Sequence, residues 1–236
     1  MTGEERQLAT RRILAVAERL SAVREHLVFI GGTVLPLLVN VDKLFYAPRM
    51  TDDVDAVGIA TGYVESTRVE TAVRAAGYTV DPTSKHKGRW ISKDGEVFDL
   101  SFAGDFPGAS GALVDRMAIE TAQEMEGHPE VRHLSPTGLF LMKCAAYGDR
   151  GKSRPAESKD LADLAVLLVG TDIEKDVSTR SEAVRAEVKR RAELLLADRG
   201  ARGALLSHFS ERYPIPPDTP EELADAAVAV LTRLAE

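Results

Sequence analysis

The run Arg49-Met50-Thr51-Asp52-Asp53-Val54-Asp55-Ala56-Val57 lies downstream of an apolar stretch that ends at Gly31-Gly32-Thr33. In an extended segment alternate side chains share a face, so we expect Asp53 and Asp55 to point the same way while Val54 and Ala56 face the core. Two such carboxylates can hold magnesium. Thr-Asp-Asp is also a common start of a helix or turn, so the pair alone leaves both interpretations open.

Strands and helices are predicted on both sides of this run. An amphipathic helix opens the chain with apolar residues up to Leu20 at roughly helical spacing. Next, Leu27-Val28-Phe29-Ile30 predicts a strand, Gly31-Gly32 a tight turn, and Val34 to Leu38 a helix. The acidic run predicts a second strand through Ile59, and Val64 to Ala76 predicts a helix stopped by Gly77.

A third carboxylate is expected on a hairpin farther along the chain. Arg89 to Phe102 contains two short runs joined by Lys93-Asp94-Gly95, which is typical of a β-hairpin. On its second strand Phe98, Leu100 and Phe102 share one face, which leaves Asp99 on the other. Three carboxylates on the exposed faces of neighbouring strands would repel one another unless metal ions bind among them.

The second half of the chain reads as helical. Ser135-Pro136 offers an N-cap and a proline at the first helical position, so a helix should run to about Tyr147, and a second should cover Ser158 to Val169. The predicted fold class is α/β (α+β), a mixed sheet flanked by helices and followed by a helical C-terminal region. We expect a core over residues 1–134 and a helical domain over residues 135–236.

Composition limits the classes of function. The chain has 236 residues, 44% hydrophobic and 28% charged, which is ordinary for a globular protein. Its single cysteine, Cys144, excludes an internal disulfide and fits a reducing cytosol. The charged N-terminus and the lack of a long apolar run predict a cytoplasmic protein without membrane contact. The net charge of -7 leaves nucleic-acid binding to local basic patches.

Two further segments are candidates for binding phosphate. Gly31-Gly32-Thr33 can bring backbone amides and a hydroxyl close to an anion, although Gly-Gly before a helix is often plain turn chemistry. Lys143 and Arg150 are seven residues apart and share a face on a continuing helix, so both could reach a triphosphate or simply lie at the surface. Asp160 either pairs with a cation or starts the next helix.

Four motifs in order resemble the nucleotidyltransferases of the DNA polymerase β superfamily, and more closely the AbiEii-type toxin nucleotidyltransferases. The resemblance covers about residues 27 to 169. It rests on four segments: Phe29-Ile30-Gly31-Gly32-Thr33, Arg49-Met50-Thr51-Asp52-Asp53-Val54-Asp55, the Lys-x6-Arg segment Lys143 to Arg150, and Lys159-Asp160-Leu161-Ala162-Asp163.

The resemblance implies roles for these residues. Asp53 and Asp55 would bind two Mg²⁺ ions, or Mn²⁺ in their place, with Asp99, assigned by strand parity, as the third carboxylate. Asp160 would support the site. The nucleotide would be bound by Gly31, Gly32, Thr33, Thr51, Lys143 and Arg150. Thr51 is additionally a candidate for blocking by modification, although a turn threonine that bonds its own backbone is the simpler interpretation.

We therefore expect a magnesium-dependent transfer of NMP from an NTP to a hydroxyl. The resemblance implies a tRNA or other RNA end as acceptor and a cognate antitoxin protein as partner. The alternatives are a small-molecule nucleotidyltransferase and a non-catalytic protein that binds nucleotide or a partner. A basic rim would favour RNA; its candidates are Lys85, Lys87, Arg89, Lys152 and Arg154.

Overall fold

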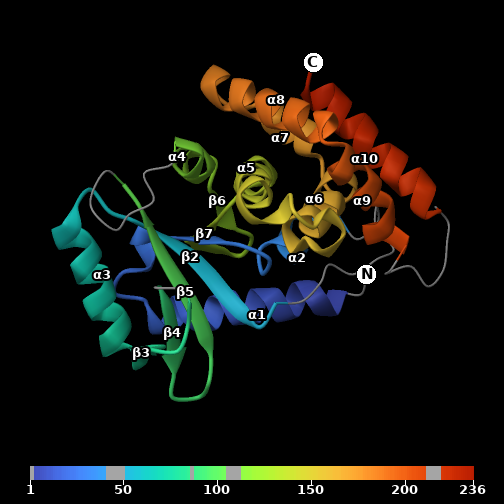
Figure 1. The fold of residues 1–236 in the computed structure, drawn as a ribbon. Coiled ribbons are helices and arrows are strands. Elements are labelled where there is room, and N and C mark those ends of the chain that lie inside the picture. The colour runs from blue at the N-terminus through green and yellow to red at the C-terminus, as the bar shows by residue number, and fades with distance from the viewer. Residues whose placement is uncertain (1–2, 41–50, 86–87, 105–112, 211–218) are drawn as a thin grey trace. The chain divides into compact units, whose positions relative to one another are not determined.

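A computed structural model describes residues 3–40, 51–85, 88–104, 113–210 and 219–236 (Figure 1). Arg49 and Met50 of the acidic run and Lys87 of the proposed basic rim lie outside these ranges. The chain forms two compact units. The sheet unit comprises Glu4–Leu37 and Met50–Leu134, and the helical unit comprises Met1–Gly3, Leu38–Arg49 and Ser135–Glu236.

The sheet unit is built on a mixed sheet whose strands follow the order β3-β4-β5-β2-β1-β7-β6. Their bounds are β1 (Leu27–Ile30), β2 (Asp53–Ile59), β3 (Tyr78–Val80), β4 (Arg89–Ser92), β5 (Val97–Ala103), β6 (Gln123–Met125) and β7 (His128–His133). The central strand β2 pairs antiparallel with β1 and parallel with β5, which places Asp55 opposite both Ile30 and Asp99. The mixed sheet with its helices confirms the predicted fold class.

Strand parity sets which residues form the core. Val54 and Ala56 of β2 and Phe98 and Leu100 of β5 are buried, whereas the aspartates between them are half-buried. The predicted hairpin is present as the antiparallel pair β4 and β5, and Figure 1 shows β5 beside β2. Four α-helices and one 3-10 helix accompany the described part of the sheet: α1 (Gly3–Arg19), η1 (Arg24–His26), α2 (Leu35–Leu38), α3 (Tyr63–Ala75) and α4 (Leu113–Glu120).

The helical unit is centred on α6 (Lys159–Gly170), which is buried along nearly its whole length because its apolar residues surround the helix on every side. The hydroxyls of Ser135 and Ser158 accept the backbone N–H of Gly138 and Leu161, as N-caps of α5 and α6. The remaining elements are α5 (Pro136–Ala146), η2 (Tyr147–Gly151), η3 (Pro155–Glu157), α7 (Ile173–Ser178), α8 (Glu182–Ala197), α9 (Arg199–Ser210) and α10 (Pro220–Leu234).

Two local features differ from the sequence expectations. The segment that contains Arg150 is a π-helix, η2, instead of a direct continuation of α5. The helix α4 lies before Ser135, in a segment for which the sequence predicted no helix. No described helix is long and apolar enough to cross a membrane. The division into a core, residues 1–134, and a C-terminal domain, residues 135–236, stays a prediction.

A buried histidine at the end of β7 predicts a pH dependence of stability. His133 is 4% exposed, and its Nδ1 lies 2.8 Å from the carbonyl oxygen of Leu134. Burial, the largest influence, lowers the pKa of His133, so the unfolded chain takes up its proton first as the pH falls. This contribution to stability is complete above the unfolded pKa, about 6.5, and is lost as the pH falls below it.

We expect the free energy of unfolding to decrease when the pH is lowered from about 7 to about 5, and to decrease less in the variant His133→Gln. Urea unfolding of both proteins at each pH measures the difference. An equal pH dependence in the two proteins would show that His133 does not contribute.

Candidate functional site

Asp53, Asp55 and Asp99 form one group, which we call the carboxylate cluster. Each offers a carboxylate oxygen, and these oxygens all lie within 4.8 Å of one another. The parallel pairing of β2 with β5 places Asp55 opposite Asp99, and Asp53 precedes Asp55 on the same face. Three oxygen donors at this spacing could hold a divalent cation of the hard, oxygen-preferring kind. Asp52 has the opposite parity, and its side chain is fully exposed.

The absence of a side chain at Gly31, in the turn after β1, leaves space for the carboxylate of Asp55. Gly31 has a φ of 77°, in the left-handed region that favours glycine. A Cβ at this position would lie 2.1 Å from Oδ2 of Asp55, which is inside van der Waals contact. The first glycine of the Gly-Gly pair therefore positions a carboxylate of the cluster, whatever its role toward phosphate.

The effect of this close approach can be tested with Gly31→Ala. We expect the added methyl group to displace the Asp55 carboxylate and to lower nucleotide transfer by about 10²-fold, as expected for a shift of roughly 1 Å at a reacting centre. Gly127→Ala is the matched control, because Gly127 has a φ of 78° and open space where its Cβ would lie. Equal activities of the two variants would refute the steric explanation.

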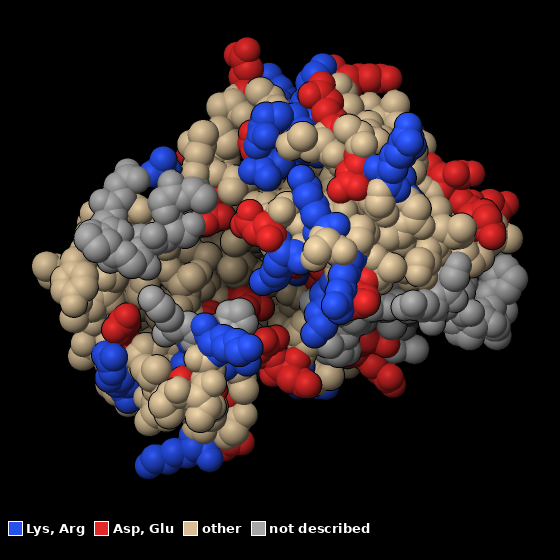
Figure 2. All heavy atoms as spheres, in the orientation of Figure 1, with Lys and Arg blue, Asp and Glu red and all other residues tan. Residues whose placement is uncertain are grey.

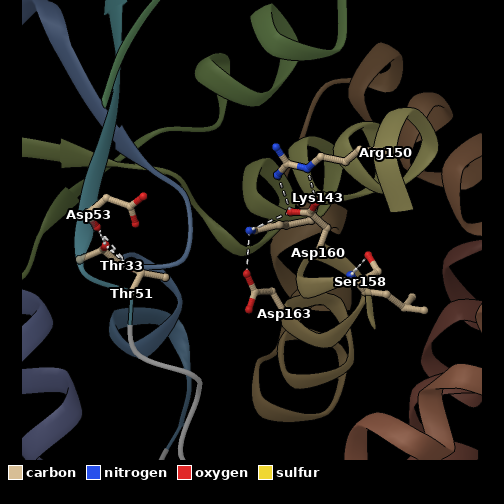
Figure 3. Close-up of polar contacts among 9 residues, drawn as sticks. Thr33, Thr51, Asp53, Lys143, Arg150, Ser158, Asp160 and Asp163 are labelled. Atoms are coloured by element: carbon tan, nitrogen blue, oxygen red, sulfur yellow. Dashed lines mark hydrogen bonds and ion pairs between the residues drawn. The ribbon is translucent and has the colours of Figure 1, made fainter. Parts of the chain in front are cut away.

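Two buried threonines fix the start of β2 (Figure 3). The hydroxyls of Thr33 and Thr51 lie 2.9 Å apart, and they donate to the carbonyl oxygen of Asp53 at 2.7 Å and 3.2 Å. Arg12 donates to the carbonyl oxygen of Thr51. Thr51 thus has the backbone bond expected of a turn threonine. A contact of Thr33 or Thr51 with nucleotide stays a prediction.

The sheet unit also places a cation against the carboxylate cluster, which sequence reasoning missed. Arg89 donates from Nε to Oδ1 of Asp99 at 2.8 Å and from Nη2 to Oδ2 of Asp99 at 2.6 Å. The same Nη2 lies 3.0 Å from Oδ2 of Asp53. Hydrogen bonds to Asp99 raise the pKa of Arg89 above its ordinary value, so the side chain stays charged. The sequence predicts the hairpin but not its register, and it is the register that sets Arg89 opposite Asp99.

A second charged group lies in the helical unit and is buried except for Arg150 (Figure 3). The ammonium of Lys143 lies 3.2 Å from Oδ1 of Asp160 and 2.6 Å from Oδ2 of Asp163. Arg150 donates to both carboxylate oxygens of Asp160, from Nε at 2.8 Å and from Nη2 at 3.1 Å. We call these four residues the Lys143 network. Lys143 therefore has carboxylate partners, and Asp160 both pairs with cations and lies in the first turn of α6, whereas a contact of Lys143 or Arg150 with a triphosphate stays a prediction.

The members of the Lys143 network differ in exposure. The side chains of Lys143, Asp160 and Asp163 are 9%, 4% and 1% exposed, whereas that of Arg150 is 66% exposed. Burial alone would raise the pKa of Asp160, but the hydrogen bonds from Arg150 and the charge of Lys143 outweigh it and hold the pKa below its ordinary value. Asp163 was not among the predicted site residues, although it follows Asp160 at helical spacing.

The structure therefore collects the predicted residues into two groups. Gly31, Thr33, Thr51 and the carboxylate cluster belong to the sheet unit, and Lys143, Arg150 and Asp160 belong to the helical unit. In each group, carboxylates contact cations of the same unit.

The chain was compared with known protein families, curated proteins and solved structures. Residues 12–233 match the family model described as nucleotidyl transferase AbiEii toxin, type IV TA system. Among solved structures, the chain is similar to ANT(2'')-Ia in complex with adenylyl-2''-tobramycin, with 18% sequence identity and a TM-score of 0.47 over 80% of this chain and 99% of that one. No curated protein sequence matches the chain.

Proposed function

Since the chain belongs to the AbiEii family of nucleotidyltransferase toxins, we propose that it transfers a nucleoside monophosphate from an NTP to a hydroxyl of RNA, with a tRNA end as the expected acceptor. The observation that carries the proposal is the carboxylate cluster, three oxygen donors within 4.8 Å of one another on adjacent strands. The acceptor oxygen forms a bond to the α-phosphorus, the bond from that phosphorus to the bridging oxygen breaks, and pyrophosphate leaves.

Asp53, Asp55 and Asp99 would hold two Mg²⁺ ions, and Mn²⁺ could replace them. Bound magnesium would neutralise the triphosphate and lower the pKa of the attacking hydroxyl. The chain itself orients the donors: Gly31 admits the Asp55 carboxylate, and the hydroxyls of Thr33 and Thr51 hold the backbone of Asp53. Asp99 is the proposed acceptor of the hydroxyl proton or a metal ligand.

Lys143, Arg150 and Asp160 remain the proposed nucleotide-site residues of the helical unit. Of the two cations, Arg150 is the more accessible to a phosphate, because its side chain is 66% exposed while Lys143 is enclosed with two carboxylates. Asp160 would orient the guanidinium of Arg150 through its pair of hydrogen bonds. In the sheet unit, the backbone amides of the Gly31-Gly32-Thr33 turn are the groups proposed to bind phosphate.

The choice of RNA as acceptor is supported by exposed basic residues in both units. Lys85 is exposed in the sheet unit, and Lys152 and Arg154 are exposed in the helical unit. On the face drawn in Figure 2, acidic and basic side chains alternate over the helical unit, so local contacts and not a wholly basic surface would bind phosphates. Arg89 contacts the carboxylate cluster and is therefore a weaker candidate for the basic rim. The family description also supports an antitoxin as partner.

The test is incubation of the protein with Mg²⁺, each NTP labelled at its α-phosphate, and total tRNA, beside Asp53→Ala as the inactive control. Label on RNA with the wild type alone would support the proposal. A parallel arm replaces tRNA by an aminoglycoside. Label on the aminoglycoside only would favour the small-molecule enzyme, and no transfer to either acceptor with any NTP would favour a non-catalytic role.

A further inference from the structure

Arg89 contacts two members of the carboxylate cluster, Asp53 and Asp99, through the carboxylate oxygens that could also hold a cation. It makes two hydrogen bonds to Asp99 and one to Asp53, all from Nε and Nη2. The side chains of Arg89, Asp53 and Asp99 are only 25%, 33% and 19% exposed, so water screens these charges incompletely.

Backbone hydrogen bonds on both sides of Arg89 fix the position from which its side chain extends. The N–H of Leu100 donates to the carbonyl oxygen of Gly88 at 2.8 Å, and the N–H of Asp81 donates to that of Arg89 at 2.9 Å. A Cβ at Gly88 would lie 1.9 Å from the carbonyl oxygen of Leu100, so this close approach requires glycine. The register of β4 with β5 then sets Arg89 directly across from Asp99.

We infer that Arg89 is a positioning residue that serves as the internal counter-cation of the carboxylate cluster, and that a divalent metal must displace its guanidinium from Asp53 to enter. The inference rests on the proposed metal-dependent function. Three carboxylates carry three negative charges when ionised, and Arg89 offsets one of them. The guanidinium and the metal compete for the same oxygens, so Arg89 weakens metal binding while it holds the metal-free carboxylates together.

The geometry predicts which contact of Arg89 breaks first when a metal ion enters the carboxylate cluster. Asp99 is held by a two-point contact, which is the stronger arrangement for arginine and a carboxylate, whereas Asp53 has a single contact with Arg89. Metal entry therefore separates Arg89 from Asp53 first. Nη2 keeps its bond to Asp99, and its N–H that contacted Asp53 becomes available to an incoming phosphate, so Arg89 links metal occupancy to nucleotide binding.

The test is Mn²⁺ binding by the full chain, measured by the electron paramagnetic resonance signal of free Mn²⁺. Removing the competing charge in Arg89→Gln should tighten binding by about tenfold. Arg89→Lys, which keeps the charge but not the two-point contact, should give an intermediate affinity. Lys85→Gln is the matched control, because it removes one positive charge from an exposed lysine of the same chain segment, and its affinity should change by less than about twofold. Unchanged or weaker binding by Arg89→Gln would overturn the inference.

A measurement on the unmodified protein tests the same point. The Nε–H resonance of Arg89, assigned by its absence from Arg89→Lys, should shift during a Mg²⁺ titration with the midpoint of metal binding. Saturation without any shift would also overturn the inference. Asp53→Asn separates the two proposals. If the wild type binds Mn²⁺ and Asp53→Asn does not, the metal site is supported, and the Arg89 variants alone decide the inference. If the wild type does not bind Mn²⁺, both the metal-dependent function and the role of Arg89 are rejected.

Discussion

Replacement of Asp53 by asparagine should lower the rate of nucleotide transfer by about 10³-fold or more, because several kcal/mol of transition-state stabilisation depend on the metal that this carboxylate is proposed to hold. The substitution keeps the size of the side chain, and Asp53 is only half-buried, so the fold should persist. Single-turnover transfer of label from an α-labelled NTP measures the rate, and circular dichroism checks the fold.

The neighbouring residue provides a matched control. Asp52 is one position away with a fully exposed side chain, and it lies 3.7 Å from Arg12. Asp52→Asn removes the same charge from the same segment but has the opposite strand parity, so we expect activity within about twofold of the wild type, as for an exposed ion pair. Similar losses in the two variants would indicate a general electrostatic effect and would reject Asp53 as a specific ligand.

Replacement of Lys143 by methionine should lower the free energy of unfolding by about 3–5 kcal/mol, the usual result of removing one partner from a buried ion pair. The ammonium is 9% exposed and lies between Asp160 and Asp163, which are almost completely buried. Without it, the two buried carboxylates lose the ammonium that lies between them, and Arg150 still contacts Asp160. Urea unfolding measures the difference.

Two further variants make this prediction specific. Lys159→Met removes an exposed lysine at the start of α6, and its stability should differ from that of the wild type by less than about 0.5 kcal/mol. Adding Asp163→Asn to Lys143→Met removes one of the two buried negative charges that the ammonium separated, so the double variant should be more stable than Lys143→Met alone. A double variant that is less stable would show that Asp163 stabilises the fold by contacts independent of Lys143.

Strand periodicity made the carboxylate cluster predictable from the sequence. The alternation of Asp53, Val54, Asp55 and Ala56 specifies one buried and one accessible face, and Phe98 and Leu100 do the same around Asp99. These local patterns set the face of each strand, whereas the approach of Asp55 and Asp99 also depends on the pairing of β2 with β5. The roles of the cluster in metal binding and of the other site residues in nucleotide binding stay predictions.

The missed features depend on contacts between segments. In the sequence, Arg89 is one member of a basic run. Only the pairing register of β4 with β5 shows that it is the neighbour of Asp99. Asp163 is one of several acidic residues until α5 and α6 pack and enclose Lys143. The π-helix after Ala146 interrupts the helical periodicity on which the pairing of Lys143 with Arg150 was based. Propensity does not specify these pairings, because tertiary packing creates them.

The chain passes between the two units more than once, so neither unit is a single continuous segment. Leu38–Arg49 belongs with Ser135–Glu236, although it lies between two segments of the sheet unit. There the N–H of Asn40 donates to the carbonyl oxygen of Gly170 at 2.8 Å. A fragment that ends at residue 134 would retain the whole carboxylate cluster but lose this attachment for the connection between β1 and β2. We therefore expect that grafting or splitting this protein requires the later helices as well, in the same chain or as a complementing fragment.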